Sequence, residues 1–156
     1  MPLFKKRAAK KLLEEAIVYH QQKNLPKAKE TFEKSLSIYE KLPESHLLYG
    51  DLLKELKQPA EAERHYRRAT ELKPDLAEAH GALGELLHRQ GRKQEAEKSY
   101  KKSIEVNPYY VNSYLNLATL YQDCAAFDQM KVVYKQALPY IEDPSLKRRI
   151  EEKLRF

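Results

Sequence analysis

Apolar and small residues recur at helical spacing along almost the whole chain. One stripe contains Leu12, Ala16 and Tyr19, and a later one contains Ala79, Leu83 and Leu87. Steps of three and four residues place such side chains on one face of an α-helix, whereas a half-buried strand would alternate apolar and polar residues. The pattern predicts an all-α chain of short amphipathic helices.

Glycine and proline mark where these helices begin and end. Pro26 and Pro59 lie where second helices are expected to begin, since the first turn of a helix tolerates proline. The segment GELLHRQGRKQEAEKSY, residues 84–100, contains two glycines and a basic run. A phosphate-binding P-loop needs GxxxxGK[ST] after a strand, and neither is present. We therefore interpret Gly91 as a helix end.

Self-similarity at a fixed interval organises the chain. The same interval separates Gly50 from Gly84, Tyr66 from Tyr100, and Pro74 from Pro108. Four registers follow without a gap: 9–42, 43–76, 77–110 and 111–144. Residues 1–8 are expected to form a basic N-terminal extension. Residues 145–156 are expected to form a capping helix, because Leu146, Ile150 and Leu154 fall on one face after the last repeat.

The third repeat resembles the tetratricopeptide repeat (TPR) pattern, which runs W-x2-L-G-x2-Y, then A-x3-F, then P. It reads His80-x2-Leu83-Gly84-x2-Leu87, then Ala96-x3-Tyr100, then Pro108. The resemblance implies a right-handed solenoid of antiparallel helix hairpins. It also implies a non-enzymatic protein–protein interaction module, an adaptor, scaffold or assembly factor that binds a peptide or helix in its concave groove.

Two local features in and just before the third repeat lead to expectations about packing and helix capping. Gly84 is interpreted as a glycine that lets the two helices of a hairpin approach closely. Because Ala118 occupies the equivalent place in the fourth repeat, Gly84→Ala is expected to be mild and Gly84→Leu damaging. Asp75 and Glu78 have the spacing of a capping box at a helix start.

The net charge of +6 is concentrated at the chain ends. Lys5, Lys6 and Arg7 give the first eight residues three positive charges, and residues 145–156 contain five basic and two acidic residues. Solvated helix tips explain this, but contacts with RNA in a ribonucleoprotein are an alternative, as is an anionic membrane surface. No apolar run is long enough to span a membrane, and one cysteine, Cys124, favours a reducing compartment. Cytoplasm is the expected location, with nucleus or organelle matrix open.

Nothing in the sequence predicts catalysis, a cofactor or a metal site. His20 and His88 occupy the same place in repeats one and three, and two repeats separate them by about 20 Å at a helix spacing of about 8–10 Å. His46 and His80 stand at the tryptophan place and are expected to be packed helix residues. The glutamates mostly have lysines three or four residues away, as on a solvated face.

In the family that the chain resembles, the first helix of each repeat lines the concave side of the solenoid. The predicted groove residues are Leu13, Ile17, Leu47, Leu48, Asp51, Gly81, Ala82, Glu85, His88, Arg89, Asn112, Leu115, Asn116, Thr119 and Gln122. Four of these residues, Leu13, Ile17, Leu47 and Leu48, are apolar and would be unusual on an exposed face. They could form a pocket for an apolar anchor of a peptide. Alternatively, they are covered by Leu3 and Phe4 or by an extended first helix. Asn112 and Asn116 could bind a peptide's own amides, and Gly81 and Ala82 would allow close approach.

One function of the family, the carboxylate clamp for acidic C-terminal chaperone tails, is not expected. The clamp needs lysine and asparagine in one first helix, asparagine in the next, and lysine and arginine in a third. Those places hold Leu13, Ile17, Leu48, Glu78 and Ala82 in one register. They hold Leu47, Asp51, Ala82, Asn112 and Asn116 in the next. Neither set matches, so no chaperone tail is expected as a partner.

Overall fold

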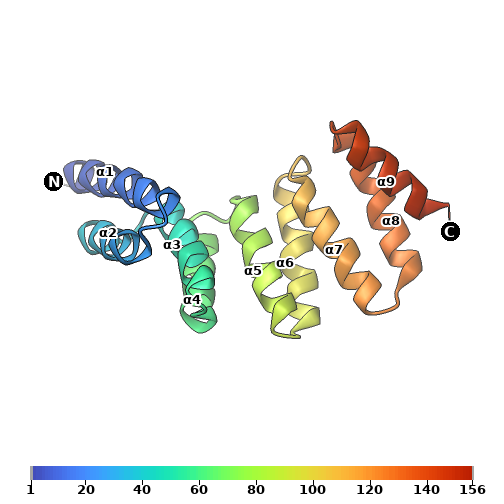
Figure 1. Cartoon of the computed structure of the whole chain (residues 1–156), viewed down its shortest axis with the longest axis horizontal. Coiled ribbons are helices and arrows are strands. Elements are labelled where there is room, and N and C mark those ends of the chain that lie inside the picture. Colours follow the sequence, from blue (N-terminus) through green and yellow to red (C-terminus); the bar gives the residue numbers. More distant parts are fainter. Residues whose placement is uncertain (1, 156) are drawn as a thin grey trace. The chain divides into compact units, whose positions relative to one another are not determined.

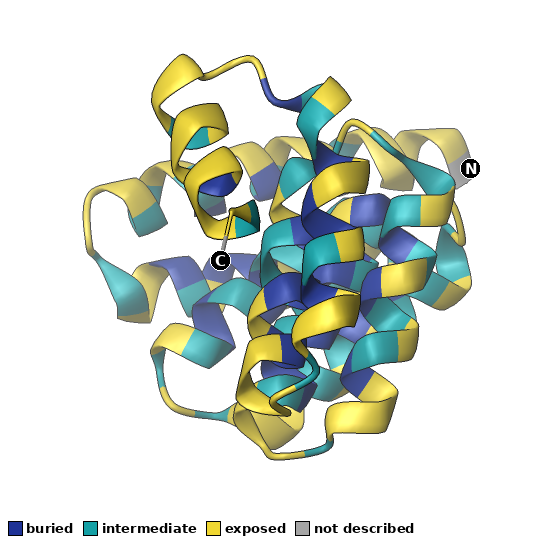
Figure 2. Cartoon of the chain, turned by 90° about the vertical axis from the view of Figure 1, so that its right-hand side faces the viewer, coloured by how far each residue is buried: buried dark blue, intermediate teal, exposed yellow. Residues whose placement is uncertain are grey.

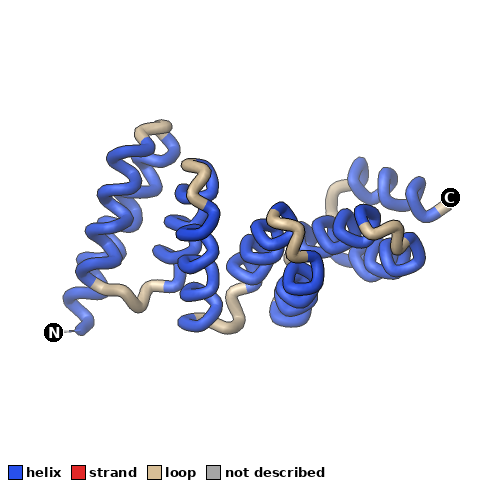
Figure 3. Tube along the Cα trace, turned by 90° about the horizontal axis from the view of Figure 1, so that it is seen from below, coloured by secondary structure: helices blue, strands red, loops and turns tan. Residues whose placement is uncertain are grey.

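The computed structural model describes residues 2–155, and in that range it contains nine α-helices, one 3-10 turn and no strand (Figures 1 and 3). The all-α prediction is therefore confirmed. The chain divides into two compact units, with the division between Pro74 and Asp75. Each unit holds two helix hairpins.

The first unit consists of four helices in which consecutive helices pack as antiparallel pairs. α1 packs against α2, α3 packs against α4, and α2 joins the two hairpins by contacting α3. The helices are α1 (Pro2–Gln21), α2 (Leu25–Ile38), α3 (Pro43–Glu55) and α4 (Pro59–Leu72). Because α1 begins at Pro2, residues 2–8 of the expected extension form the first two turns of this helix.

The second unit repeats this arrangement and adds a final helix. α5 pairs with α6 and α7 pairs with α8, while α9 packs on α8. The elements are α5 (Ala77–Arg89), α6 (Lys93–Val106), α7 (Val111–Asp123), α8 (Phe127–Ala137), η1 (Leu138–Tyr140) and α9 (Pro144–Leu154). In α9 only Ile150 is fully buried, and Leu146 and Leu154 are half-buried.

Each hairpin turns at one residue in the left-handed region of backbone space. These residues occupy the same place in the four repeats: Lys23, Lys57, Gly91 and Ala125, with φ of 60°, 58°, 76° and 53°. Only the third hairpin has glycine there, the residue that adopts this conformation without steric cost. Gly91 follows the end of α5 and precedes α6, so its predicted role as a helix end is confirmed.

Helix starts follow the predicted proline signals in part. Pro26 and Pro59 lie in the first turns of α2 and α4. The Asp143 carboxylate accepts a hydrogen bond from the Ser145 N–H at 2.9 Å and so caps α9. The predicted capping box at Asp75 is wrong: the N-cap of α5 is Leu76, which offers no side-chain acceptor.

The core of each of the two middle hairpins has a tyrosine ring pressed against a glycine of the neighbouring helix. A Cβ atom added to Gly84 would lie 2.7 Å from the Tyr100 ring, and one added to Gly50 would lie 2.6 Å from Tyr66. Both rings are fully buried, as is typical of the inner helix faces in Figure 2. A methyl group at Gly84 would overlap the Tyr100 ring, so the ring must shift in Gly84→Ala, and we expect this substitution to cost more than the sequence alone suggested.

Buried serines join successive hairpins inside each unit. The Ser35 hydroxyl donates to the Ala9 carbonyl at 2.8 Å and lies 3.3 Å from the Ser45 hydroxyl. In the second unit the Ser103 hydroxyl donates to the Ala77 carbonyl at 2.7 Å, and Ser113 donates to Ser103 at 2.6 Å. The two networks use equivalent positions two repeats apart, so buried hydroxyls that would otherwise be costly are satisfied in the same way twice.

Candidate peptide-binding face

The predicted groove residues of the first unit lie on α1 and α3. Ile17, Leu47 and Leu48 are partly exposed, as expected. Leu13 is not, since only 8% of its surface is accessible. It lies four residues after Ala9 and three before Ala16, on the face of α1 that forms the core, so its assignment to the groove surface is wrong. Leu3 and Phe4 are 80% and 78% exposed and therefore do not cover the apolar residues.

Gly81 is a second correction. It is buried, and a Cβ added there would lie 2.9 Å from the Tyr110 ring and 3.0 Å from the Ser113 hydroxyl. Its small size therefore serves the packing of α5 against the start of α7. Ala82 is half-buried and stays available on this face.

Polar residues on the face of the first unit are bound to one another. Asp51 accepts a hydrogen bond from the Tyr66 hydroxyl at 2.7 Å. At the end of α3, the Glu55 carboxylate meets His20 Nε2 at 2.7 Å and the Lys23 ammonium at 3.2 Å. The hydrogen bond from His20, and then that from Lys23, lower the pKa of Glu55. These contacts tie the end of α1 to the end of α3.

The second unit repeats this connection. His88 Nε2 lies 3.0 Å from the Asp123 carboxylate, and the Lys93 ammonium donates to the Asp123 carbonyl at 3.2 Å. His88 and Asp123 stand two repeats after His20 and Glu55. The sequence prediction considered these histidines as metal ligands and placed His88 in the groove, and it missed their carboxylate partners because those belong to the next repeat. A step of one repeat plus one residue was the available signal.

Amide side chains on α7 are the polar groups of this face that the fold does not use. Asn112 is exposed and Asn116 is half-buried, and neither side chain forms a hydrogen bond among the described residues. The same holds for Gln122, about three turns beyond Asn112. By contrast Glu85 pairs with Arg89 at 3.0 Å. Thr119 donates to the Leu115 carbonyl at 2.9 Å.

A cavity of about 550 Å³ lies at the end of α7, beside Gln122. Its lining combines one groove residue, two apolar side chains and two lysines: Gln122, Phe127, Met130, Lys131 and Lys153. Phe127 is 54% exposed although it is a large aromatic residue. The sequence prediction considered only first helices, so it missed Phe127 and Met130, which belong to α8.

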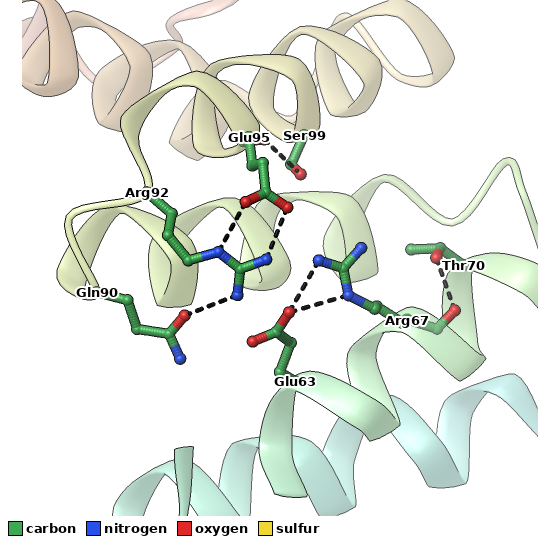
Figure 4. Close-up of polar contacts among 7 residues, drawn as sticks. All are labelled: Glu63, Arg67, Thr70, Gln90, Arg92, Glu95 and Ser99. Atoms are coloured by element: carbon green, nitrogen blue, oxygen red, sulfur yellow. Dashed lines mark hydrogen bonds and ion pairs between the residues drawn. The ribbon is translucent and has the colours of Figure 1, made fainter. Parts of the chain in front are cut away.

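Ion pairs on the second helices of the hairpins join residues three or four positions apart. On α4 the Arg67 guanidinium binds Glu63 at 2.8 Å, and at the start of α6 Arg92 binds Glu95 at 2.7 Å (Figure 4). Exposed pairs of this kind contribute little to stability. In residues 2–155 no group of three or more histidine, cysteine, aspartate or glutamate side chains is arranged to hold a metal ion.

A pair of imidazoles lies between α3 and α4. His46 Nδ1 and His65 Nδ1 are 2.8 Å apart, and His46 Nε2 donates to the Glu40 carbonyl at 2.8 Å. The His65 ring also packs edge-on against Tyr49, with 4.7 Å between ring centroids. Burial and then the neighbouring His46 lower the pKa of His65 to about 4, and burial also lowers the pKa of His46.

Comparison with protein families identifies the repeats. Two family models described as tetratricopeptide repeat match residues 7–75 and 47–110. The chain belongs to the tetratricopeptide repeat family. Its TPR hairpins are the fold of a protein–protein interaction module, as the resemblance implied. The sequence matches no curated protein.

Solved structures with this fold include TPR proteins that bind peptides. YrrB, described as a TPR protein with an unusual peptide-binding site, is 23% identical, with a TM-score of 0.76, over 93% of this chain and 75% of that one. The first TPR of Spaghetti (RPAP3), bound to the HSP90 peptide SRMEEVD, is 22% identical, with a TM-score of 0.73, over 77% and 95%. PilF of Pseudomonas aeruginosa is 20% identical, with a TM-score of 0.82, over 97% and 71%.

No helix in the described part of the chain is both long and apolar enough to cross a membrane.

Proposed function

We propose that this TPR protein is a non-enzymatic adaptor that binds an extended segment of a partner protein along α7. The observation that carries the proposal is the pair of unpaired amides one turn apart, Asn112 and Asn116, on the helix whose Gln122 lines the cavity beside Phe127. From Asn112 to Gln122, α7 rises about 15 Å at about 1.5 Å per residue. That length matches four or five residues of extended chain at about 3.3–3.6 Å each.

The chemistry of these amides suits a peptide backbone. An asparagine side chain offers both a donor and an acceptor, so it can pair with the N–H and C=O of one residue of a bound chain. Because these amides have no partner in the fold, binding a peptide breaks no internal bond. Phe127 and Met130 in the lining of the cavity suit an apolar side chain of the peptide.

Pull-down from lysate of the native host tests the assignment. Wild type is compared with Asn112→Ala/Asn116→Ala and with Gln94→Ala, an exposed amide on α6 with no bond in the described structure. A partner retained by wild type and by Gln94→Ala should be lost from the double variant. Removing one buried partner of a hydrogen bond costs about 1–3 kcal/mol, so titration of that partner should show a roughly 5- to 150-fold loss for Asn116→Ala. Equal binding by all three proteins would exclude this face.

The nature of the ligand separates this proposal from contacts between RNA and the basic chain ends. Phosphate contacts weaken steeply with added salt, whereas docking of a largely uncharged peptide barely responds. The partner recovered by pull-down should therefore bind with similar affinity at about 50 and 200 mM salt. The clamp residues for an acidic chaperone tail are absent, so a peptide such as SRMEEVD is not the expected ligand.

A further inference from the structure

A second cavity, of about 370 Å³, is formed by residues of α3 and α4 in the first unit. It is lined by basic groups and one carboxylate: His46, Arg64, His65, Arg67, Arg68 and Glu71. Cavities that hold small ligands usually measure about 300–1,000 Å³, so this one accommodates a compact group.

The three arginines differ in how far their charges are compensated. Arg67 is held by Glu63 through two N–H groups, at 3.0 and 2.8 Å. Arg68 binds Glu71, a mostly exposed carboxylate, at 3.1 Å, and such a bond is exchanged at little cost. Arg64 forms no ion pair among the described residues, and it lies one helical turn before Arg68 on α4.

The imidazole pair adds a donor that depends on its charge. A carbonyl oxygen only accepts, so the bond to Glu40 fixes the His46 proton on Nε2 and leaves His46 Nδ1 as an acceptor. His65 therefore donates through Nδ1, and its Nε2 is the unprotonated nitrogen. Protonating His65 adds a donor at Nε2 and breaks neither bond.

The groups around the pair explain why it is neutral. Burial is the largest effect that lowers the pKa of each imidazole, and the charges of Arg64 and Arg68 lower it further. The carboxylates of Glu33, Glu40 and Glu71 raise the pKa, but by less than burial lowers it. The neutral rings therefore do not add to the positive charge of the arginines, and a bound anion would compensate that charge.

We propose that this cavity binds a phosphate monoester group, held by the guanidinium groups of Arg64 and Arg68 beside His65. Guanidinium groups bind phosphate oxygens through paired N–H bonds, and two guanidinium groups one helical turn apart can both bind one phosphate group. A monoester fits better than the backbone of a nucleic acid, which requires a longer track of cations with stacking surfaces. The site consists of first-unit residues, α7 belongs to the second unit, and the proposal does not depend on the α7 face.

The first experiment uses sulfate, which keeps its charge throughout the titration of the histidines. NMR of the His46 and His65 rings in the full chain is followed with sodium sulfate and, at equal ionic strength, with sodium chloride. Sulfate should raise the pKa of His65 from about 4 by about one unit, the shift that a tenfold preference for the protonated form produces. Identical titrations in the two salts would overturn the proposal.

The second experiment identifies the source of the phosphate and the residues. Inorganic phosphate, a phosphoserine tripeptide, its unphosphorylated form and a short single-stranded RNA are titrated into wild type, Arg64→Gln/Arg68→Gln and Arg148→Gln. Arg148 is the matched control, because it is an exposed arginine paired with Glu152 in the second unit. The phosphoserine peptide should bind wild type and Arg148→Gln, and lose about tenfold or more in affinity to the double variant.

The remaining outcomes of that titration are also decisive. Stronger binding of the phosphopeptide than of inorganic phosphate assigns the site to a phosphorylated partner, whereas equal or stronger binding of inorganic phosphate would overturn the assignment to a monoester. Preference for RNA, or equal binding to the double variant with unchanged circular dichroism, would overturn the proposal.

Discussion

The buried tyrosine hydroxyls differ between hairpins in whether they form a hydrogen bond. The buried Tyr66 hydroxyl donates to Asp51 at 2.7 Å, but the hydroxyl of Tyr100, the equivalent residue of the next repeat, has no hydrogen-bond partner in the described structure. Glu85 occupies the place of Asp51 and is paired with Arg89 instead. Burying a tyrosine whose hydroxyl has no hydrogen-bond partner costs more free energy than burying a phenylalanine ring at the same place.

The two tyrosines should therefore respond in opposite ways to loss of the hydroxyl. Tyr66→Phe should destabilise the first unit by about 1–3 kcal/mol, because Asp51 loses a buried donor. Tyr100→Phe should be neutral or stabilising. Urea unfolding followed by circular dichroism measures both. Equal losses in the two variants would show that the Tyr100 hydroxyl has a partner in solution.

The imidazole pair makes stability depend on pH. The pKa of His65 is about 4 in the folded chain, well below the ordinary value of about 6.5. As the pH falls from about 6.5 towards 4, the unfolded chain takes up a proton that the folded chain refuses, so stability decreases over that window. Above it the contribution is fully present.

Substitution of His65 tests this coupling. The unfolding free energy of wild type should fall between pH 7.5 and 5.5, a range above the titration of most carboxylates. His65→Gln should start lower at pH 7.5, since His46 loses its donor, but should fall less over the same range. Equal slopes for the two proteins would assign the pH dependence to other groups.

At the level of elements, the turns of the hairpins show what the sequence could and could not reveal. Periodicity predicted the helices well, since steps of three and four residues report directly on a buried face. It did not reveal that Lys23, Lys57 and Ala125 share the backbone conformation of Gly91, because only glycine marks that conformation in a sequence. Leu13 and Gly81 were assigned to the groove because the spacing of a helix does not tell which neighbour covers its side.

The four turns predict a matched pair of substitutions. A left-handed conformation costs a residue with a Cβ atom roughly 1–2 kcal/mol. Gly91→Ala should therefore destabilise by about 1 kcal/mol, and from backbone strain alone, since no atom lies within 4 Å of the added methyl group. Ala125→Gly should stabilise, by less, because glycine loses more entropy on folding. Thermal unfolding of both variants is the measurement, and a stabilising Gly91→Ala would contradict the assigned turn geometry.

At the scale of the whole molecule, the chain is a two-repeat module used twice. The serine networks and the pairs His20–Glu55 and His88–Asp123 recur every second repeat, so odd and even repeats have different roles. The sequence showed the period of a single repeat because glycine, tyrosine and proline mark it. The doubled period is carried by serines and by a glutamate replaced with aspartate, which look like ordinary surface variation until their contacts are known. Asn112 is exposed and Asn116 is half-buried, so their role in binding stays a prediction, whereas the cavity beside Gln122 depends on how α8 and α9 pack.

In a solenoid each repeat contacts only its neighbours, so loss of the last helix should act locally. We expect α9 to cap the second unit, and removal of residues 145–156 should expose the surface that Ile150 covers. The loss should be about 2–4 kcal/mol, less than the burial of three large side chains, because Leu146 and Leu154 are only half-buried. Hydrogen exchange should show faster opening of α7 and α8, with protection in α1 to α4 unchanged. Ile150→Ala should reproduce most of the effect and Glu151→Ala, an exposed residue on the same helix, none of it. If α1 to α4 lost protection to the same extent as α7 and α8, the two units would unfold together and the capping role of α9 would not be local.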